Sequence, residues 1–125
     1  MKESIKKQDL STEFFTPEKC FIVELSNSAD DENLSIARAR VEPGVSTRWH
    51  RLKTSAERYY ILSGTGRVEI SDLSSEVVGP GDVVIIPPMA PQRITNTGQE
   101  DLIFLALCTP PFTSQDYEDI DETPA

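Results

Sequence analysis

Short runs rich in Val, Ile, Phe and Tyr recur along the chain, separated by turn-forming stretches. These stretches are NSADDEN, EPG, SGTG, DLSS, GPGD and NTGQED. Gly, Pro, Asn and Asp favour tight turns, and strands at such short intervals are typical of β-sandwiches and β-barrels. No long helical period competes with them. The pattern therefore predicts an all-β chain.

The 125 residues suit a single compact domain. We expect an N-terminal arm or short helix at residues 1–15, one barrel domain at 16–112 and an acidic C-terminal tail at 113–125. The strands are predicted at 20–25, 34–41, 46–52, 57–62, 67–71, 76–78, 83–86, 92–96 and 102–108. The tail contains DYEDIDE, which we interpret as a solvated segment rather than a binding element.

Charge and hydropathy exclude several classes of partner. Twenty-one acidic against twelve basic residues give a net charge of −9, which repels nucleic acid and anionic membrane surfaces. No apolar run approaches the ~18 residues of a membrane span, and no apolar stretch follows the N-terminal lysines as in a secretory signal. Cys20 and Cys108 lie outside any C-x-x-C pair and are expected to be reduced core residues. We therefore expect a cytoplasmic protein that binds neither nucleic acid nor membrane.

In two predicted strands, apolar residues occupy both the odd and the even positions, so both faces of each strand are apolar. They are VVII at 83–86 and LIFLAL at 102–107. Both faces of such strands are expected to be covered, one by the barrel interior and the other by a partner. A homodimer is the favoured explanation, and an N-terminal arm folded over that face is the alternative.

Two spaced motifs carry the polar residues of interest. The first contains Gly44, His50, Leu52, Glu57 and Gly64, and the second contains Gly81, Pro87, Met89, Gln92 and Asn96. The intervals resemble the two motifs of the cupin family. There the first has a glycine, two histidines one residue apart, a glutamate and a glycine, and the second has proline, glycine, histidine and asparagine. The resemblance implies a cupin-type double-stranded β-helix, a jelly-roll barrel of two antiparallel sheets.

The resemblance also implies a metal site, which this chain matches only in part. The family's ligand positions correspond to His50, residue 52, Glu57 and residue 92. Here residue 52 is leucine, which gives no ligand, and Gln92 offers only an amide oxygen. One divalent transition metal ion at His50, Glu57 and Gln92 is the resulting expectation, with Zn, Mn, Fe, Ni and Cu not distinguished.

Strand alternation leads to a similar site without the family. Side chains two residues apart share a face, so Arg48 and His50 lie together, as do Glu57 and Tyr59. If these faces line the barrel, they converge with Gln92 in one pocket. We expect Arg48 and Tyr59 to bind a ligand. In the alternative, the Arg48 guanidinium pairs with the Glu57 carboxylate. It would then neutralise that carboxylate and repel a metal cation.

Two functions follow from this pocket. In the first, the chain is a metal-dependent enzyme of isomerase, cyclase, lyase or dioxygenase type, acting on a small oxygenated molecule. Glu57 or a metal-bound water would then move a proton. In the alternative, the chain is a metal-free barrel that binds a small molecule through hydrogen bonds and has no catalytic activity.

Overall fold

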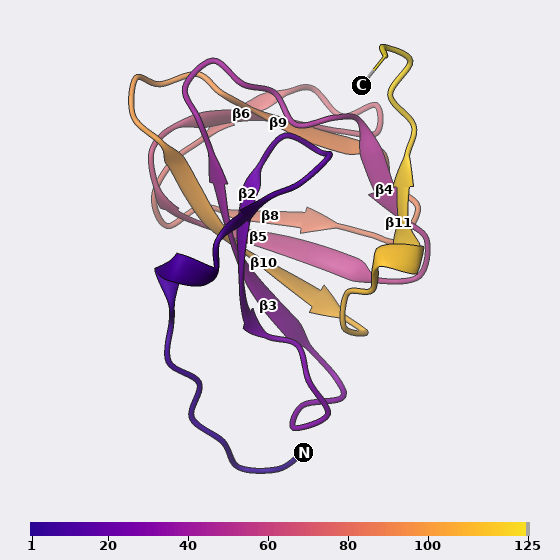
Figure 1. The fold of residues 1–125 in the computed structure, drawn as a ribbon. Helices are drawn as coiled ribbons and strands as arrows, with labels where there is room; N and C mark the ends of the chain where they lie inside the picture. Colours follow the sequence, from indigo (N-terminus) through magenta and orange to yellow (C-terminus); the bar gives the residue numbers. More distant parts are fainter. Residues whose placement is uncertain (125) are drawn as a thin grey trace.

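Two antiparallel sheets face each other in the computed structural model, which describes residues 1–124 (Figure 1). The strands are β1 (Phe14–Phe15), β2 (Phe21–Ser26), β3 (Ser35–Val41), β4 (His50–Leu52), β5 (Ala56–Ser63), β6 (Gly66–Ile70), β7 (Glu76–Val78), β8 (Val83–Ile86), β9 (Gln92–Asn96), β10 (Leu102–Thr109) and β11 (Tyr117–Asp119). Two single 3₁₀ turns, η1 (Leu10–Thr12) and η2 (Ser114–Asp116), complete the elements. The predicted all-β, cupin-type barrel of two antiparallel sheets is confirmed.

The order of the strands places the site between the two sheets. One sheet has six strands in the order β1-β2-β3-β10-β5-β8, and the other has five in the order β11-β4-β9-β6-β7. Strands distant in sequence are therefore neighbours, and β10 lies between β3 and β5.

Within residues 1–124, no helix is long and apolar enough to span a membrane.

The core lies between the sheets and follows the period of two expected for strands with one buried face. Val41, Ile61, Ile94 and Leu102 are fully buried, and each belongs to a different strand. Gly64 fixes the turn after β5, because its φ is +86° and a Cβ there would lie 2.6 Å from the carbonyl oxygen of Asp101. No other residue type fits that position without a shift of the backbone.

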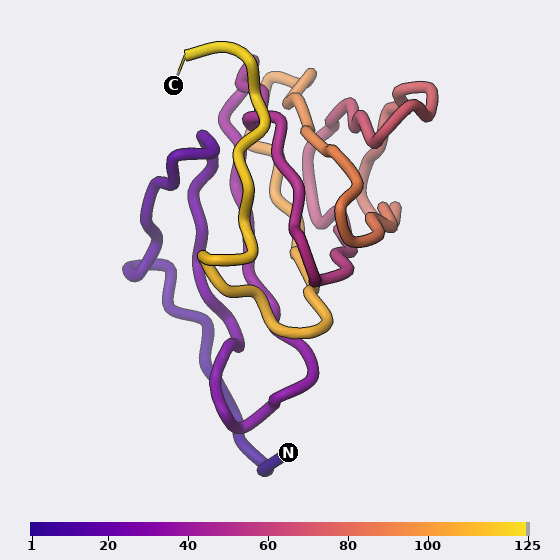
Figure 2. The backbone as a smooth tube through the Cα atoms, turned by 90° about the vertical axis from the view of Figure 1, so that its right-hand side faces the viewer, coloured from indigo at the N-terminus to yellow at the C-terminus, as the bar shows by residue number. Residues whose placement is uncertain are grey.

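The acidic C-terminal segment is not simply solvated, as the sequence led us to expect. Tyr117–Asp119 forms β11, which pairs antiparallel with β4 at the edge of the five-stranded sheet. Figure 2 shows the C-terminal segment running alongside β4. Asp116, just before this strand, is buried and accepts hydrogen bonds from the backbone nitrogens of Thr54 and Ser55. Burial opposes its ionisation, but these bonds hold the pKa of Asp116 below its usual value.

The doubly apolar strand β8 has one exposed face in this chain. Val83 is 58% exposed and Ile85 is 70% exposed, while Val84 and Ile86 are buried. The N-terminal strand β1 lies at the opposite edge of the same sheet. For β8, the alternative that the arm covers this face is therefore wrong, because Val83 and Ile85 are exposed and the arm pairs with β2 instead.

Candidate functional site

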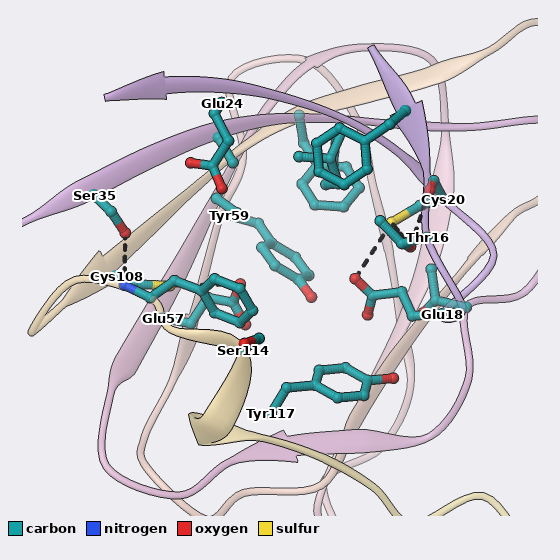
Figure 3. Close-up of a pocket in the computed structure, with 18 of the residues that line it drawn as sticks. Thr16, Glu18, Cys20, Glu24, Ser35, Glu57, Tyr59, Cys108, Ser114 and Tyr117 are labelled. Atoms are coloured by element: carbon teal, nitrogen blue, oxygen red, sulfur yellow. Dashed lines mark hydrogen bonds between the residues drawn. The ribbon is translucent and has the colours of Figure 1, made fainter. Parts of the chain in front are cut away.

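A cavity of about 320 Å³ lies inside the barrel (Figure 3). Apolar atoms make up most of the lining surface, and the apolar lining residues are Phe14, Pro17, Ile22, Ala37, Ala39, Phe104, Ala106 and Phe112. The polar and sulfur-bearing lining residues are Thr16, Glu18, Cys20, Glu24, Ser35, Thr47, Glu57, Tyr59, Cys108, Ser114 and Tyr117. Phe14, Glu24 and Ser114 are exposed and mark the mouth of the cavity, whereas Glu57 and Tyr59 are buried and form its floor.

A chain of hydrogen bonds closes this floor. The Tyr59 hydroxyl donates to the amide oxygen of Gln92, and the Gln92 amide nitrogen donates to Glu57 Oε1 over 2.8 Å. The Cys108 thiol faces the second oxygen, Glu57 Oε2, at 3.8 Å. Both ends of the Gln92 amide are thereby engaged by neighbouring side chains. The orientation of the amide follows when Glu57 is ionised, because a carboxylate oxygen only accepts and must face the amide NH₂, which leaves the amide oxygen for the phenol proton.

The strand register brings these groups together. On β5, Glu57 and Tyr59 are two residues apart and lie opposite Cys108 and Ala106 of β10. In the other sheet, Gln92 of β9 lies opposite His50 of β4. The site is therefore formed where the inner faces of the two sheets meet.

Glu57 is the most perturbed acid of the site. Burial raises the pKa of Glu57 from 4.5 to about 7, with a further increase from Glu18 and an opposing effect from His50. The carboxyl is therefore populated in both protonation states near neutral pH. Burial also raises the pKa of Tyr59 well above its usual value, so this phenol stays protonated and acts as a donor.

His50 is held on three sides. Its Nδ1 lies 2.6 Å from the carbonyl oxygen of Arg48, which only accepts, so this nitrogen carries a proton. Its Nε2 lies 3.1 Å from Glu18 Oε2, and its ring stacks on Tyr117 with centroids 5.2 Å apart. The other Glu18 oxygen accepts a 3.3 Å hydrogen bond from the thiol of Cys20. The imidazole thus faces a carboxylate rather than open space.

Arg48 does not join the pocket, in contrast to its predicted role. Its Nε donates to Asp119 over 2.7 Å, and its Nη2 donates to the Thr123 carbonyl oxygen over 2.7 Å. Strand alternation alone placed Arg48 on the His50 face. However, Arg48 lies before β4 begins, where the backbone is no longer in the ladder and alternation does not apply. The guanidinium therefore binds the C-terminal segment.

The donor set does not fit the divalent metal that the resemblance implies. Of the expected ligands, Gln92 has its amide oxygen bound by Tyr59, and His50 directs Nε2 at Glu18. Leu52 is buried and apolar. Across residues 1–124, no three His, Cys, Asp or Glu side chains are grouped to hold a metal ion. The structure does bring Glu57, Tyr59 and Gln92 together, but as partners of one another.

Two functional candidates escaped the sequence reasoning. Glu18 precedes the first long strand, and Tyr117 lies within the acidic segment. The Tyr117 hydroxyl is buried and, within the described part of the chain, has no hydrogen-bond partner. A signal existed for Tyr117, because an aromatic residue inside an acidic run is unusual for a solvated tail. For Glu18 the sequence offered no such signal.

Comparisons with known proteins agree with this architecture. Residues 37–108 match the family model described as "Cupin domain". An uncharacterized protein of Methanocaldococcus jannaschii is 39% identical over 84 residues, which cover 67% of this chain and 66% of that protein. A glucose-6-phosphate isomerase of Thermococcus kodakarensis is 37% identical over 78 residues, covering 59% of this chain and 41% of the isomerase. The chain thus spans less than two thirds of the length of these curated relatives.

Solved structures share the fold at low sequence identity. The nucleoside dehydratase Pac13 superposes with a TM-score of 0.76 at 18% identity, covering 98% of this chain and 100% of that one. A Streptomyces PAC13 variant was determined with uridine. Oxalate decarboxylase of Lactobacillus farciminis, in a formate complex, has a TM-score of 0.75 at 23% identity, covering 87% of this chain and 33% of that one.

Proposed function

Because the chain belongs to the cupin family, we propose that it binds a small, largely apolar molecule inside the barrel by hydrogen bonds and without a metal ion. The observation that carries this proposal is the pairing of Tyr59, Gln92 and Glu57 beside a cavity of about 320 Å³. At the family's ligand positions, Glu57 and Gln92 bind each other and His50 faces Glu18, and the cavity remains for the ligand.

The size and lining of the cavity suit such a ligand. Small-molecule pockets usually measure about 300–1,000 Å³ and combine an apolar lining with a few placed polar groups. Here the rings of Phe104 and Phe112 and the small side chains of Ala37 and Ala106 leave room for an apolar body. Glu57 and Tyr59 on the floor would meet its polar end. The named relatives and neighbours include enzymes of small molecules, which supports the small size of the ligand but not its apolar character.

Proton transfer is a second candidate function, and one observation favours it. The Glu57 carboxyl lines the cavity, and its Oε2 has only the long thiol contact of Cys108. A carboxylate in this position can take a proton from one atom of a bound ligand and return it to another, as in an isomerisation. Glu57 is then the catalytic residue, and its pKa of about 7 suits both steps at neutral pH.

We also propose that two copies associate through the exposed face of β8. Val83, Ile85 and Tyr60 form a contiguous apolar area on the outer side of β5 and β8. β8 is also a free edge of its sheet, with backbone groups open to pairing. Both features favour association with an identical strand.

A cavity-filling variant tests the binding proposal. Ala106→Leu places extra carbons in the cavity, and Ala37→Leu, directly opposite on β3, is an independent second variant. Leu105→Ile, on the other face of β10, is the matched control. Binding of 2-phenylethanol is measured by calorimetry, with and without EDTA. We expect wild type and control to bind equally in both buffers, and both filled variants to lose binding at least tenfold. Unchanged binding by the two folded variants contradicts the proposal.

A further inference from the structure

We infer that the ligand of this cavity carries no anionic group and presents a hydroxyl or amino group as a hydrogen-bond donor. The inference rests on the proposed binding function and adds the chemical class of the ligand. It follows from the charges that line the cavity and from the directions of the nearby cations.

Every charged side chain lining the cavity is acidic. Glu18, Glu24 and Glu57 belong to the lining, which contains neither lysine nor arginine. Glu57 is at the buried floor and Glu24 at the exposed mouth, so acidic groups are present at both ends. The single imidazole of the chain, His50, is not part of the lining. Its Nε2 lies 3.1 Å from Glu18 Oε2. No positive group of the lining is free to receive an anion.

Three arginines near the barrel direct their guanidinium groups away from the cavity. Arg48 binds Asp119 and the carbonyl oxygen of Thr123. Arg58, next to Glu57 on β5, faces the opposite side of the sheet and donates to the Thr109 hydroxyl. Arg40 pairs with Glu13 at 2.6 Å. Each guanidinium is occupied outside the cavity.

An anionic ligand would therefore be placed among carboxylates in a mostly apolar space. Loss of hydration disfavours a charge that gains no opposite partner, and like charges within the same cavity add to the cost. A hydroxyl or amino group is instead favoured in the cavity, because carboxylate oxygens accept hydrogen bonds from it. Glu57 Oε2 is the acceptor best placed for this, since its present partner is a thiol at 3.8 Å.

Tyr117 is a further polar residue of the cavity wall. Its hydroxyl is buried without a partner among the described residues, and its ring lines the cavity beside His50. Burial raises the pKa of Tyr117, so the phenol stays neutral and adds no charge to the cavity wall. It can both accept from an amino or hydroxyl group and donate to an uncharged oxygen. A buried polar atom of this kind normally has a partner, and the Tyr117 hydroxyl would gain one from a ligand only if its side chain turned toward the cavity.

This ligand class differs from the phosphosugar named for the Thermococcus isomerase. A phosphate is bound by guanidinium, ammonium or helix N-terminal groups. The cavity lining has no Lys or Arg, and the structure described here has no α-helix beside it. A glucose-6-phosphate-type ligand is therefore not expected to bind here.

Three matched probes test the inference. 2-Phenylethylamine, 2-phenylethanol and phenylacetate share one apolar body and differ in their charged or polar end, and glucose 6-phosphate is the fourth ligand. Binding is measured by calorimetry at pH 7.5 and low salt for wild type, for Ala106→Leu and for Glu18→Gln. We expect the amine and the alcohol to bind at least tenfold more tightly than phenylacetate, with no binding of glucose 6-phosphate. Glu18→Gln should reduce the ratio between the affinities for 2-phenylethylamine and for phenylacetate.

The outcomes separate the two proposals. If phenylacetate or glucose 6-phosphate binds as tightly as the amine and the alcohol, and Ala106→Leu abolishes that binding, the cavity is a ligand site but its inferred selectivity is overturned. If binding of the amine and the alcohol survives in Ala106→Leu, the ligand site is elsewhere and the binding proposal fails. If no probe binds wild type, both proposals are contradicted.

Discussion

The guanidinium of Arg48 and the carboxylate of Asp119 are joined by a 2.7 Å hydrogen bond that ties the start of β4 to β11. Arg48 is 5% exposed. Further bonds hold the same segment, since the backbone nitrogen of Trp49 donates to Asp121 Oδ2 over 2.9 Å. Tyr117, on the cavity wall, belongs to the strand that these contacts fix. Arg48 therefore acts on the site through the C-terminal segment.

Arg48→Ala is expected to loosen β11 more than Arg51→Ala does. Arg51 is a matched control, because it joins the same two strands through Glu118 but at the surface, where ion pairs contribute little. Hydrogen exchange of the backbone amides of residues 117–121 should become several-fold faster in Arg48→Ala than in Arg51→Ala. Equal exchange in the two variants would show that the Asp119 bond does not hold the strand.

The stability contribution of Glu57 is expected to fall as pH rises. Its folded pKa of about 7 lies above the ordinary 4.5, so between these values the folded state binds more protons than the unfolded state. Stability linked to this group is then fully present below about pH 4.5 and is lost as pH rises through 7. Glu57→Gln, which cannot ionise, should gain stability relative to wild type between pH 5 and pH 8 in urea unfolding. Glu76→Gln, at an exposed position of β7, serves as the control and should show no such gain.

Tyr59→Phe is expected to destabilise the fold by about 1–3 kcal/mol. The substitution leaves the buried amide oxygen of Gln92 without its donor, and a buried unsatisfied polar group costs this order of free energy. Tyr60→Phe is the control, since Tyr60 is 44% exposed on the other face of β5 in the single chain, and both variants are made in the Ile85→Glu background, which removes the proposed contact between copies. Urea unfolding of both variants measures the difference. A loss no larger for Tyr59 than for Tyr60 would mean that the network is not a stabilising one.

Ile85→Glu is expected to convert a wild-type dimer into a monomer. The side chain is 70% exposed in the single chain, so a charge there does not disturb the core but would be buried in the proposed contact. Light scattering at micromolar concentration gives the mass of both proteins. Glu76→Gln, in β7 of the five-stranded sheet and outside β8, should leave the mass unchanged. A monomeric wild type contradicts the proposed association.

The fold was largely predictable because it follows from local patterns. Turn residues and alternation located β7, β8 and β9 with their observed bounds, and the spacing of the two motifs identified the barrel. The short strands β1 and β11 were missed. Phe14–Phe15 is too short to show alternation, and Tyr117–Asp119 is formed by long-range contacts to Arg48 and β4 that no local pattern encodes.

The sequence predicted the residues at the floor of the cavity but not those of its walls. Alternation correctly placed Glu57, Tyr59 and Gln92 toward one another, since each lies inside a regular strand. Glu18 and Tyr117 come from outside the two motifs, and their position depends on how the chain ends pack. Residue types also did not reveal that Gln92 engages both ends of its amide within the protein. That fact required the register of the two sheets.

The metal content of the wild-type protein tests the central claim most directly. Protein purified without chelator or affinity metal is measured by elemental analysis and then titrated with Mn²⁺, Fe²⁺, Ni²⁺, Cu²⁺ and Zn²⁺ while its melting temperature is followed. His50→Ala is measured beside it. A double variant, Leu52→His with Gln92→His, restores the imidazoles that the family resemblance implies. We predict substoichiometric metal and an unchanged melting temperature for wild type, and a gain of metal binding in the double variant. Stoichiometric metal in wild type that is lost in His50→Ala would contradict the metal-free account.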